Sequence, residues 1–134
     1  PSRETDPAMV LDFITKSQVD SLAISFGNVH GKYRGEPRLN YGLVEEIAGL
    51  TDVPLTMHGG SGLTKEQYEK SIAAGISNIH FYTNITLGLW KHLEETARER
   101  DYQPVYHELC GATIAYFKKE ILQIMEICKS AGRA

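Results

Sequence analysis

Residues 53–64 read Val-Pro-Leu-Thr-Met-His-Gly-Gly-Ser-Gly-Leu-Thr, and this stretch decides the fold. Its first part, residues 53–57, is a short apolar run typical of a buried strand. Three glycines follow within five residues, and Thr64 is a residue type that starts helices. The stretch therefore predicts a strand, a glycine-rich turn and the start of a helix, which is the unit of a parallel α/β sheet.

The same alternation extends before and after this stretch. Each predicted helix starts at a residue type that caps helix N-termini, and each leads into a short apolar run. The predicted helices cover residues 7–17 after Asp6, residues 41–48 after Asn40, and residues 65–74 after Thr64 with Gly75 as the stop, and the predicted strands cover residues 21–26, 53–57 and 76–82. Three cycles of roughly 30 residues predict parallel strands joined by right-handed crossovers, so all three strand ends should lie at one edge of the sheet.

Two further helices are predicted over residues 85–98 and 104–129. The second carries apolar side chains at a spacing of three and four, including Ile114, Phe117 and Ile121. We expect these helices to cover a barrel wall or to form a contact between copies of the chain.

Composition narrows the class of protein. The chain has 134 residues, 42% of them hydrophobic, and a formal net charge of −3, which excludes the basic field that nucleic acid or an anionic membrane needs. The sequence has no apolar run of about 18 residues and no signal-peptide profile at its start, so we expect a soluble, cytoplasmic protein. Cys110 and Cys128 would lie ~27 Å apart along one helix, too far to bridge, which predicts free thiols.

Two histidines stand beside glycines at the ends of the first two strands, His30 in Gly-Asn-Val-His-Gly and His58 in His-Gly-Gly-Ser-Gly. Equivalent positions on neighbouring parallel strands lie close enough to share one ion, and neutral imidazole is a good ligand. Alternatively, each histidine caps a strand end and hydrogen-bonds a carbonyl. A third ligand must come from elsewhere, because His92 and His107 lie in the terminal helices, where a solvated or packed histidine is the commoner outcome.

The turn after His58 has the composition of an anion cradle. Gly59, Gly60 and Ser61 would supply backbone N–H groups and a hydroxyl just before a helix N-terminus, an arrangement suited to phosphate. A plain glycine-rich turn is the alternative. Thr83, at the expected tip of the third strand, favours phosphate, since the last loops of an α/β barrel frequently bind it.

These motifs together resemble those of the class II, metal-dependent fructose-bisphosphate and tagatose-bisphosphate aldolases. The resemblance runs from residues 5–7 through both histidine motifs to the tail, residues 130–134. It implies an α/β fold in which residues 1–134 are the C-terminal half of a (β/α)8 TIM barrel with additional C-terminal helices, the N-terminal barrel half being absent.

The resemblance also implies a site. His30 and His58 correspond to ligands of Zn²⁺ or another divalent metal, which polarises the ketone of the substrate. The segments that match those holding dihydroxyacetone phosphate comprise Gly31, Gly59, Gly60, Ser61, His80, Phe81, Tyr82 and Thr83. The catalytic proton-transfer residues correspond to none in this chain, since they belong to the absent half. The sequence departs from the family where His80 replaces an asparagine and Asn84 an acid.

The function implied by this resemblance is that of a ketose-bisphosphate aldolase of carbohydrate metabolism and glycolysis, inactive as this segment alone. Its partners would be a phosphorylated ketose or triose phosphate, in a homo-oligomer or a longer polypeptide. Two alternatives stay open. One is a noncatalytic phosphosugar-binding or assembly module, and the other is a half-barrel packing unit in which the histidines are structural.

Overall fold

A computed structural model describes residues 3–31 and 35–132. Arg133 and Ala134, which end the family-like tail, lie outside the described residues. The chain divides into two compact units, Pro1–Phe81 and Tyr82–Ala134, which are described separately below.

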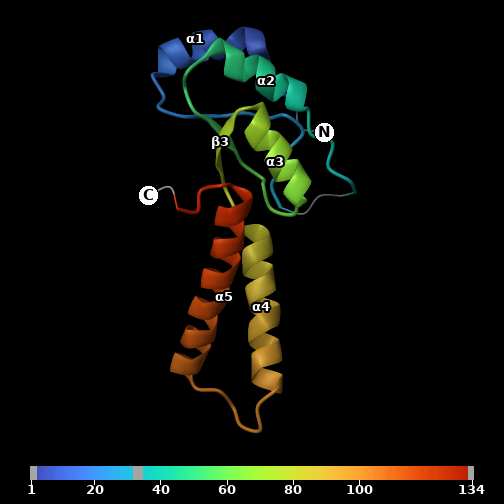
Figure 1. Ribbon diagram of the computed structural model, residues 1–134, viewed down its shortest axis with the longest axis vertical. Helices are drawn as coiled ribbons and strands as arrows, with labels where there is room; N and C mark the ends of the chain where they lie inside the picture. Colours follow the sequence, from blue (N-terminus) through green and yellow to red (C-terminus); the bar gives the residue numbers. More distant parts are fainter. Residues whose placement is uncertain (1–2, 32–34, 133–134) are drawn as a thin grey trace. The chain divides into compact units, whose positions relative to one another are not determined.

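In the first unit, helices and strands alternate (Figure 1). The elements are α1 (Pro7–Ser17), β1 (Leu22–Ala23), α2 (Tyr41–Leu50), β2 (Leu55–Met57), α3 (Lys65–Ala74) and β3 (Ile76–Ile79). The strands form one sheet in the order β1-β2-β3, and both neighbouring pairs are parallel. The predicted α/β alternation and parallel sheet are confirmed.

The predicted helix starts are also confirmed, and each cap is visible as a hydrogen bond. Asp6 Oδ1 accepts from the Ala8 N–H at 3.0 Å, and Asn40 Oδ1 accepts from the Leu43 N–H at 3.1 Å. Thr64 starts α3 with a capping box, in which it exchanges two hydrogen bonds with Gln67. Side-chain caps within a few residues of sequence therefore mark these helix starts.

The strands are shorter than the sequence predicts. The first was expected over residues 21–26 and the third over 76–82, but the paired segments are only β1 and β3. The central strand β2 has three residues, so neighbouring strands find ladder partners only along that length. The His80 N–H donates to the Met57 carbonyl at 3.0 Å as the chain leaves the sheet. The tip of the third strand therefore carries His80, whereas Thr83, expected there, begins a helix.

The core of the first unit lies between the sheet and its helices. The fully buried large side chains come from the loop after β1, from α2 and from β2, and include Phe26, Ile47, Leu55 and Met57. Helix α1 packs against α2, and α2 packs against α3. Burial of each such side chain stabilises the fold by roughly 1.5–3 kcal/mol.

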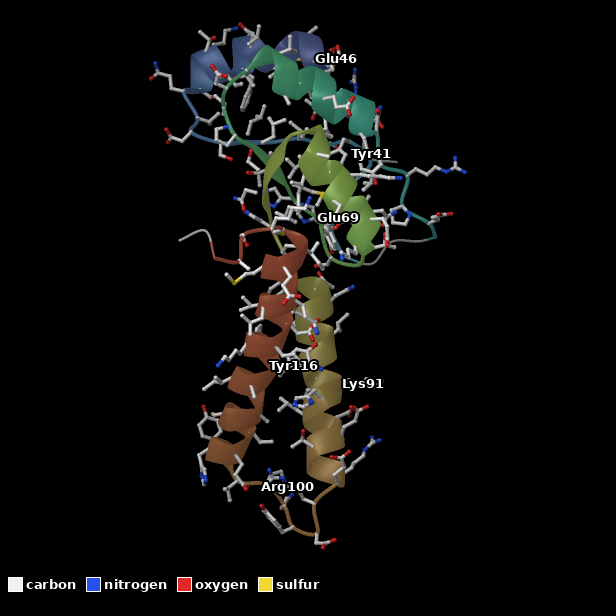
Figure 2. All side chains as sticks on the ribbon, in the orientation of Figure 1. Tyr41, Glu46, Glu69, Lys91, Arg100 and Tyr116 are labelled. Carbon is white, nitrogen blue, oxygen red and sulfur yellow. The ribbon has the colours of Figure 1, made fainter. Side chains whose placement is uncertain are left out.

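The second unit is a hairpin of α4 (Thr83–Arg98) and α5 (Tyr106–Ile127), which pack side by side (Figure 1). Tyr116 of α5, labelled in Figure 2, stacks on His92 of α4 with ring centroids 5.3 Å apart and contacts Gly88. No described residue of either helix is buried. Both predicted terminal helices are confirmed, and their apolar side chains stay largely exposed within the described chain.

Cys110 and Cys128 are both free thiols in the described part of the chain. None of the helices in residues 3–31 and 35–132 has the length and apolar composition needed to span a bilayer.

Candidate functional site

Three histidines gather where the strands end. His30 lies in the loop after β1, His58 directly follows β2, and His80 directly follows β3. The ring centroids of His30 and His58 are 5.5 Å apart, and those of His58 and His80 are 4.3 Å apart. The carboxyl edge of the sheet, where α/β folds place their ligands, therefore carries an imidazole cluster.

The loops bearing the first two histidines are joined by the buried side chain of Asn28. Its Oδ1 accepts from the Phe26 N–H at 2.8 Å, and its Nδ2 donates to the His58 carbonyl, also at 2.8 Å. A weaker bond of 3.3 Å runs from Nδ2 to the Ile24 carbonyl. Asn28 therefore fixes the distance between the loop after β1 and the backbone of His58.

The turn after His58 is held by α3. The hydroxyl of Tyr68, a buried side chain of that helix, donates to the Gly60 carbonyl. The same tyrosine packs against Phe81, with ring centroids 5.2 Å apart. Tyr68 thus connects the helix, the glycine turn and the end of the third strand segment.

Two positions in the turn require glycine for different reasons. Gly59 has φ +69°, and a Cβ there would run into the backbone carbonyl of Val29. Gly60 has an ordinary φ, but a Cβ would lie 2.8 Å from the Ile79 side chain and 3.3 Å from the His80 carbonyl. The glycines therefore let the loops after β1, β2 and β3 approach one another closely.

The electrostatics of the cluster favour neutral imidazole at its centre. Burial lowers the pKa of His58 below its usual 6.5, and the neighbouring His80 and then His30 lower the pKa further. Positive charge on one ring disfavours positive charge on the next. A neutral imidazole is the form that binds a metal ion.

The spacing of the His30 and His58 rings bears on whether they could share a divalent cation. Two imidazoles bound to one tetrahedral ion at ~2.1 Å place their ring centroids about 5 Å apart. The His30–His58 separation of 5.5 Å is close to this value, so the spacing of these two rings is compatible with one shared ion. Among the residues that the structure describes, no group of three or more His, Cys, Asp or Glu side chains could hold an ion, so a complete ion site would need ligands from outside this set.

The proposed anion cradle has mixed support. Gly60 and Ser61 are buried in the turn between β2 and α3, as a close-fitting loop requires. However, the N-terminus of α3 already uses Gln67 in its capping box, and Glu66 places a carboxylate in the first turn. A phosphate would therefore depend on the loop Gly59–Ser61 more than on the helix dipole.

The other residues expected at the site lie in two places. Gly31, with φ +84°, follows His30 directly, and Phe81 follows His80 and packs on Tyr68. Tyr82 and Thr83 belong to the second unit, where both carbonyls accept hydrogen bonds from the Thr86 hydroxyl. His30, His58 and His80 are thus brought together, whereas Tyr82 and Thr83 serve the start of α4.

Sequence reasoning missed two residues that position the site, Asn28 and Tyr68. Asn28 stands beside Gly27, and an asparagine at a turn that bonds to nearby backbone is a recognisable signal. Tyr68 is a buried side chain with a polar end on a helix beside the glycine turn, so its hydroxyl required a partner.

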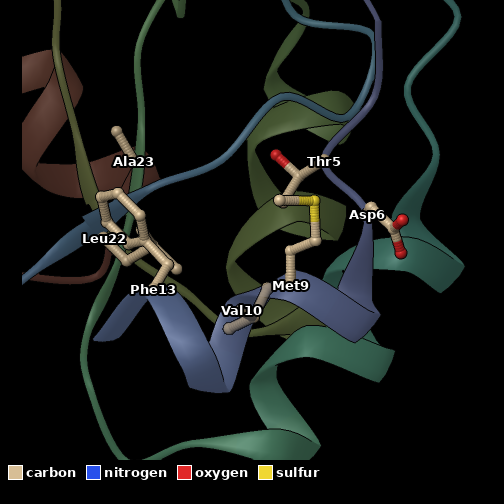
Figure 3. A pocket seen from close by; sticks show the side chains of 7 residues that line it. All are labelled: Thr5, Asp6, Met9, Val10, Phe13, Leu22 and Ala23. Atoms are coloured by element: carbon tan, nitrogen blue, oxygen red, sulfur yellow. The ribbon is translucent and has the colours of Figure 1, made fainter. Parts of the chain in front are cut away.

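A cavity of about 260 Å³ lies elsewhere in the first unit (Figure 3). Its apolar lining comes from α1 and β1 and includes Met9, Phe13 and Leu22. Thr5 at its rim exchanges hydrogen bonds with Ser25, through its backbone N–H and its hydroxyl. None of the three clustered histidines lines this cavity, which does not have the polar character of a phosphosugar site.

A three-stranded parallel sheet with covering helices and polar groups at its carboxyl edge is the arrangement found in part of an α/β barrel. Comparison with known proteins agrees, since residues 2–133 match the family described as "Fructose-bisphosphate aldolase class-II". The chain belongs to this family, whose members are in general metal-dependent.

Individual relatives share this assignment. The chain is 37% identical over 131 residues to fructose-bisphosphate aldolase of Geobacillus stearothermophilus, a match covering 96% of the chain and 45% of the relative. It is 33% identical over 126 residues to 6-phospho-5-dehydro-2-deoxy-D-gluconate aldolase of Shouchella clausii, covering 91% and 43% respectively. The chain therefore spans a little under half the length of these relatives.

A solved structure extends the likeness to three dimensions. The crystal structure of the YdjI aldolase from Escherichia coli K12 matches with a TM-score of 0.88 at 30% identity, covering 98% of this chain and 48% of that one. The expected fold class, half of a TIM barrel with additional C-terminal helices, is confirmed.

Proposed function

We propose that this chain supplies the C-terminal part of a zinc-dependent ketose-bisphosphate aldolase. The reaction would be reversible cleavage of a ketose 1,6-bisphosphate into dihydroxyacetone phosphate and an aldehyde. The observation that carries the proposal is the meeting of His30 and His58 at the carboxyl edge of the sheet, 5.5 Å apart, in a class II aldolase chain.

Each part of the site has a distinct role in this proposal. His30 and His58 hold the cation through neutral imidazole nitrogens, and the cation when bound supplies a Lewis acid for the substrate carbonyl. Gly31 and the loop Gly59–Ser61 bind the substrate phosphate through backbone N–H groups and a hydroxyl. Binding of the phosphate holds the reacting carbons in place and lowers the entropic cost of the reaction.

Further substrate contacts are proposed for the segment after β3, which comprises His80, Phe81, Tyr82 and Thr83. The relatives differ in the sugar that their names give, fructose bisphosphate in one and a phosphorylated deoxygluconate in another. Both names specify phosphorylated sugars, which supports a phosphosugar as the substrate class here. Residues 1–134 alone are proposed to be inactive, since the matched relatives are about twice as long.

The test is an aldolase assay on the full polypeptide that carries these residues. We expect triose-phosphate release from fructose or tagatose 1,6-bisphosphate, loss of activity with a chelator, and recovery with Zn²⁺. His30→Ala and His58→Ala should each lower kcat by at least about 100-fold, because a metal ligand is lost. His107→Ala, at an exposed position of α5, is the matched control. Full activity in both site variants would contradict the proposal.

A second candidate is a phosphosugar-binding module without turnover. It is favoured by one observation, that no group of three ligating side chains in the described residues could hold an ion. This candidate would be supported over the enzyme by two results for the full polypeptide. Calorimetry would show that it binds dihydroxyacetone phosphate, and assays would show no cleavage of ketose bisphosphates either with or without a chelator.

A further inference from the structure

The imidazole of His80 makes a contact that the proposed reaction does not explain. It meets the His58 ring at a centroid distance of 4.3 Å, and the two ring planes are inclined by 82°. This edge-to-face arrangement is one that paired aromatic rings prefer, and it restricts how each ring can turn.

The backbone of His80 is fixed beside the residue that precedes His58. Its N–H donates to the Met57 carbonyl at 3.0 Å, which continues the ladder between β2 and β3. On its other side, Nε2 of the His80 ring lies 3.5 Å from the side-chain amide nitrogen of Asn78. The main chain of His80 is therefore fixed by Met57, and its ring lies near the side chain of Asn78, although the His80 side chain is exposed.

The geometry separates His80 from the ligand pair. Rings sharing one tetrahedral ion have centroids about 5 Å apart, as the His30–His58 pair does at 5.5 Å. The His58–His80 separation of 4.3 Å is that of two rings in direct contact. In the described residues the three rings do not form a three-ligand cation site.

We infer that His80 is a positioning residue, whose ring holds the His58 imidazole in the orientation in which His58 and His30 meet one divalent cation. The inference rests on the proposed function for the cation itself. Groups hydrogen-bonded behind metal ligands typically change metal affinity by 10–100-fold when removed, and a ring contact corresponds to the lower end of this range, about 10-fold.

The first test needs no cation and uses the metal-free full polypeptide. In NMR spectra of the histidine rings, the carbon-bound ring protons of His58 should shift in His80→Ala and His80→Asn, because the neighbouring ring current is removed. His80→Phe keeps a ring and should change these signals much less. The exposed His107→Ala serves as control, and unchanged His58 signals in His80→Ala would overturn the inference.

The second test is titration with Co²⁺, followed by its visible absorption. His80→Ala and His80→Asn should weaken Co²⁺ binding by about 10-fold or more, while His80→Phe should stay within about threefold of wild type. Loss in His80→Phe as large as in His58→Ala would overturn the inference, because His80 would then be a ligand. Wild-type affinity in all three variants would also overturn it. Failure of the wild type to bind Co²⁺ would instead overturn the proposed function. The NMR test, which needs no cation, would still show whether the His80 ring acts on the His58 ring.

Discussion

Asn28 holds the spacing of the two loops that carry His30 and His58. Its buried amide bonds to the Phe26 N–H and to the His58 carbonyl. We expect Asn28→Ala to lower the free energy of unfolding by about 1–3 kcal/mol, because buried polar groups lose their partners. Asn28→Asp retains the acceptor for Phe26 but lacks the donor to His58. Urea unfolding at neutral pH should show Asn28→Asp to be at least as destabilised as Asn28→Ala, because its second carboxylate oxygen would face the His58 and Ile24 carbonyl oxygens. Equal stability of all three proteins would contradict this role.

Gly59 and Gly31 form a matched pair of glycines at the site. Both have positive φ, +69° and +84°, but only at Gly59 would a Cβ run into backbone, that of Val29. Gly31→Ala should cost about 1–2 kcal/mol from backbone strain alone. Gly59→Ala should cost more than Gly31→Ala and should also weaken Co²⁺ binding, since the loop after β1 must move. Equal losses of stability in urea unfolding would show that the close approach to Val29 is unimportant.

The sequence predicted that His30 and His58 lie at neighbouring strand ends, and it missed the contact between His58 and His80. His30 and His58 were recognisable because glycines flank them at strand ends, and parallel strands bring such ends together. The contact of His80 with His58 depends on a register shift, in which Leu55 pairs with Ile76 but Thr56 pairs with Asn78. Without this irregularity Ile79 would stand opposite His58. No sequence pattern predicts such a bulge, so the ring contact emerged only from the structure.

At the scale of elements, helices were predictable where local chemistry defines their ends. Asp6, Asn40 and Thr64 each accept a hydrogen bond from a first-turn N–H, which is a signal within a few residues of sequence. Strand lengths were overestimated because pairing depends on a partner distant in sequence, here the three-residue β2. The apolar run at residues 76–82 continues past the last residue that β2 can pair with.

The turn between α4 and α5 offers a prediction about pH. Glu108 accepts hydrogen bonds from the Val105 N–H at 3.0 Å and the Tyr102 hydroxyl at 2.8 Å, and it pairs with Arg100, labelled in Figure 2. These contacts, the backbone bond foremost and then the Tyr102 and Arg100 contacts, lower the pKa of Glu108 from 4.5 to about 2. A carboxyl group with a depressed pKa stabilises the folded state above the unfolded value and loses this effect on acidification.

We therefore expect the Glu108 contribution to be complete above pH 4.5 and to disappear as the pH falls towards 2. Tm can be measured from the loss of the helical signal on heating. As the pH falls from 4.5 towards 2, Tm should decrease more steeply for wild type than for Glu108→Gln. Glu126→Gln, near the other end of α5, is the control and should behave like wild type. Parallel curves for wild type and Glu108→Gln would contradict the assignment.

At the scale of the whole molecule, the described residues include sheet edges and exposed apolar side chains that could form contacts with another chain. Strands β1 and β3 are the outer strands of the described sheet, and the hairpin exposes Trp90 to 65% and Ile114 to 69%. Open sheet edges and apolar helix faces promote association. We expect residues 1–134 alone to self-associate, so that sedimentation shows mass rising with concentration. The emission of Trp90, the only tryptophan of the sequence, should shift to shorter wavelength at the same time. A monomer with exposed Trp90 at high concentration would contradict this expectation.

Whole-molecule assignments came from the motifs more than from composition, because 134 residues and a net charge of −3 fit many α/β proteins. The glycine-flanked histidines indicated the aldolase family among these proteins. The clustering of His30, His58 and His80 at the strand ends supports the proposed chemistry. The chain spans 45% of its relative from Geobacillus stearothermophilus, so the proposed zinc-dependent activity belongs to the full polypeptide.

The shared cation is tested most directly by anomalous diffraction at the zinc edge, from crystals of the full polypeptide grown with Zn²⁺. We expect one anomalous peak between the His30 and His58 rings, about 2.0–2.1 Å from a nitrogen of each. The peak should vanish in His58→Ala. A fully occupied zinc peak elsewhere in the molecule, with none between these two rings, would contradict the proposal.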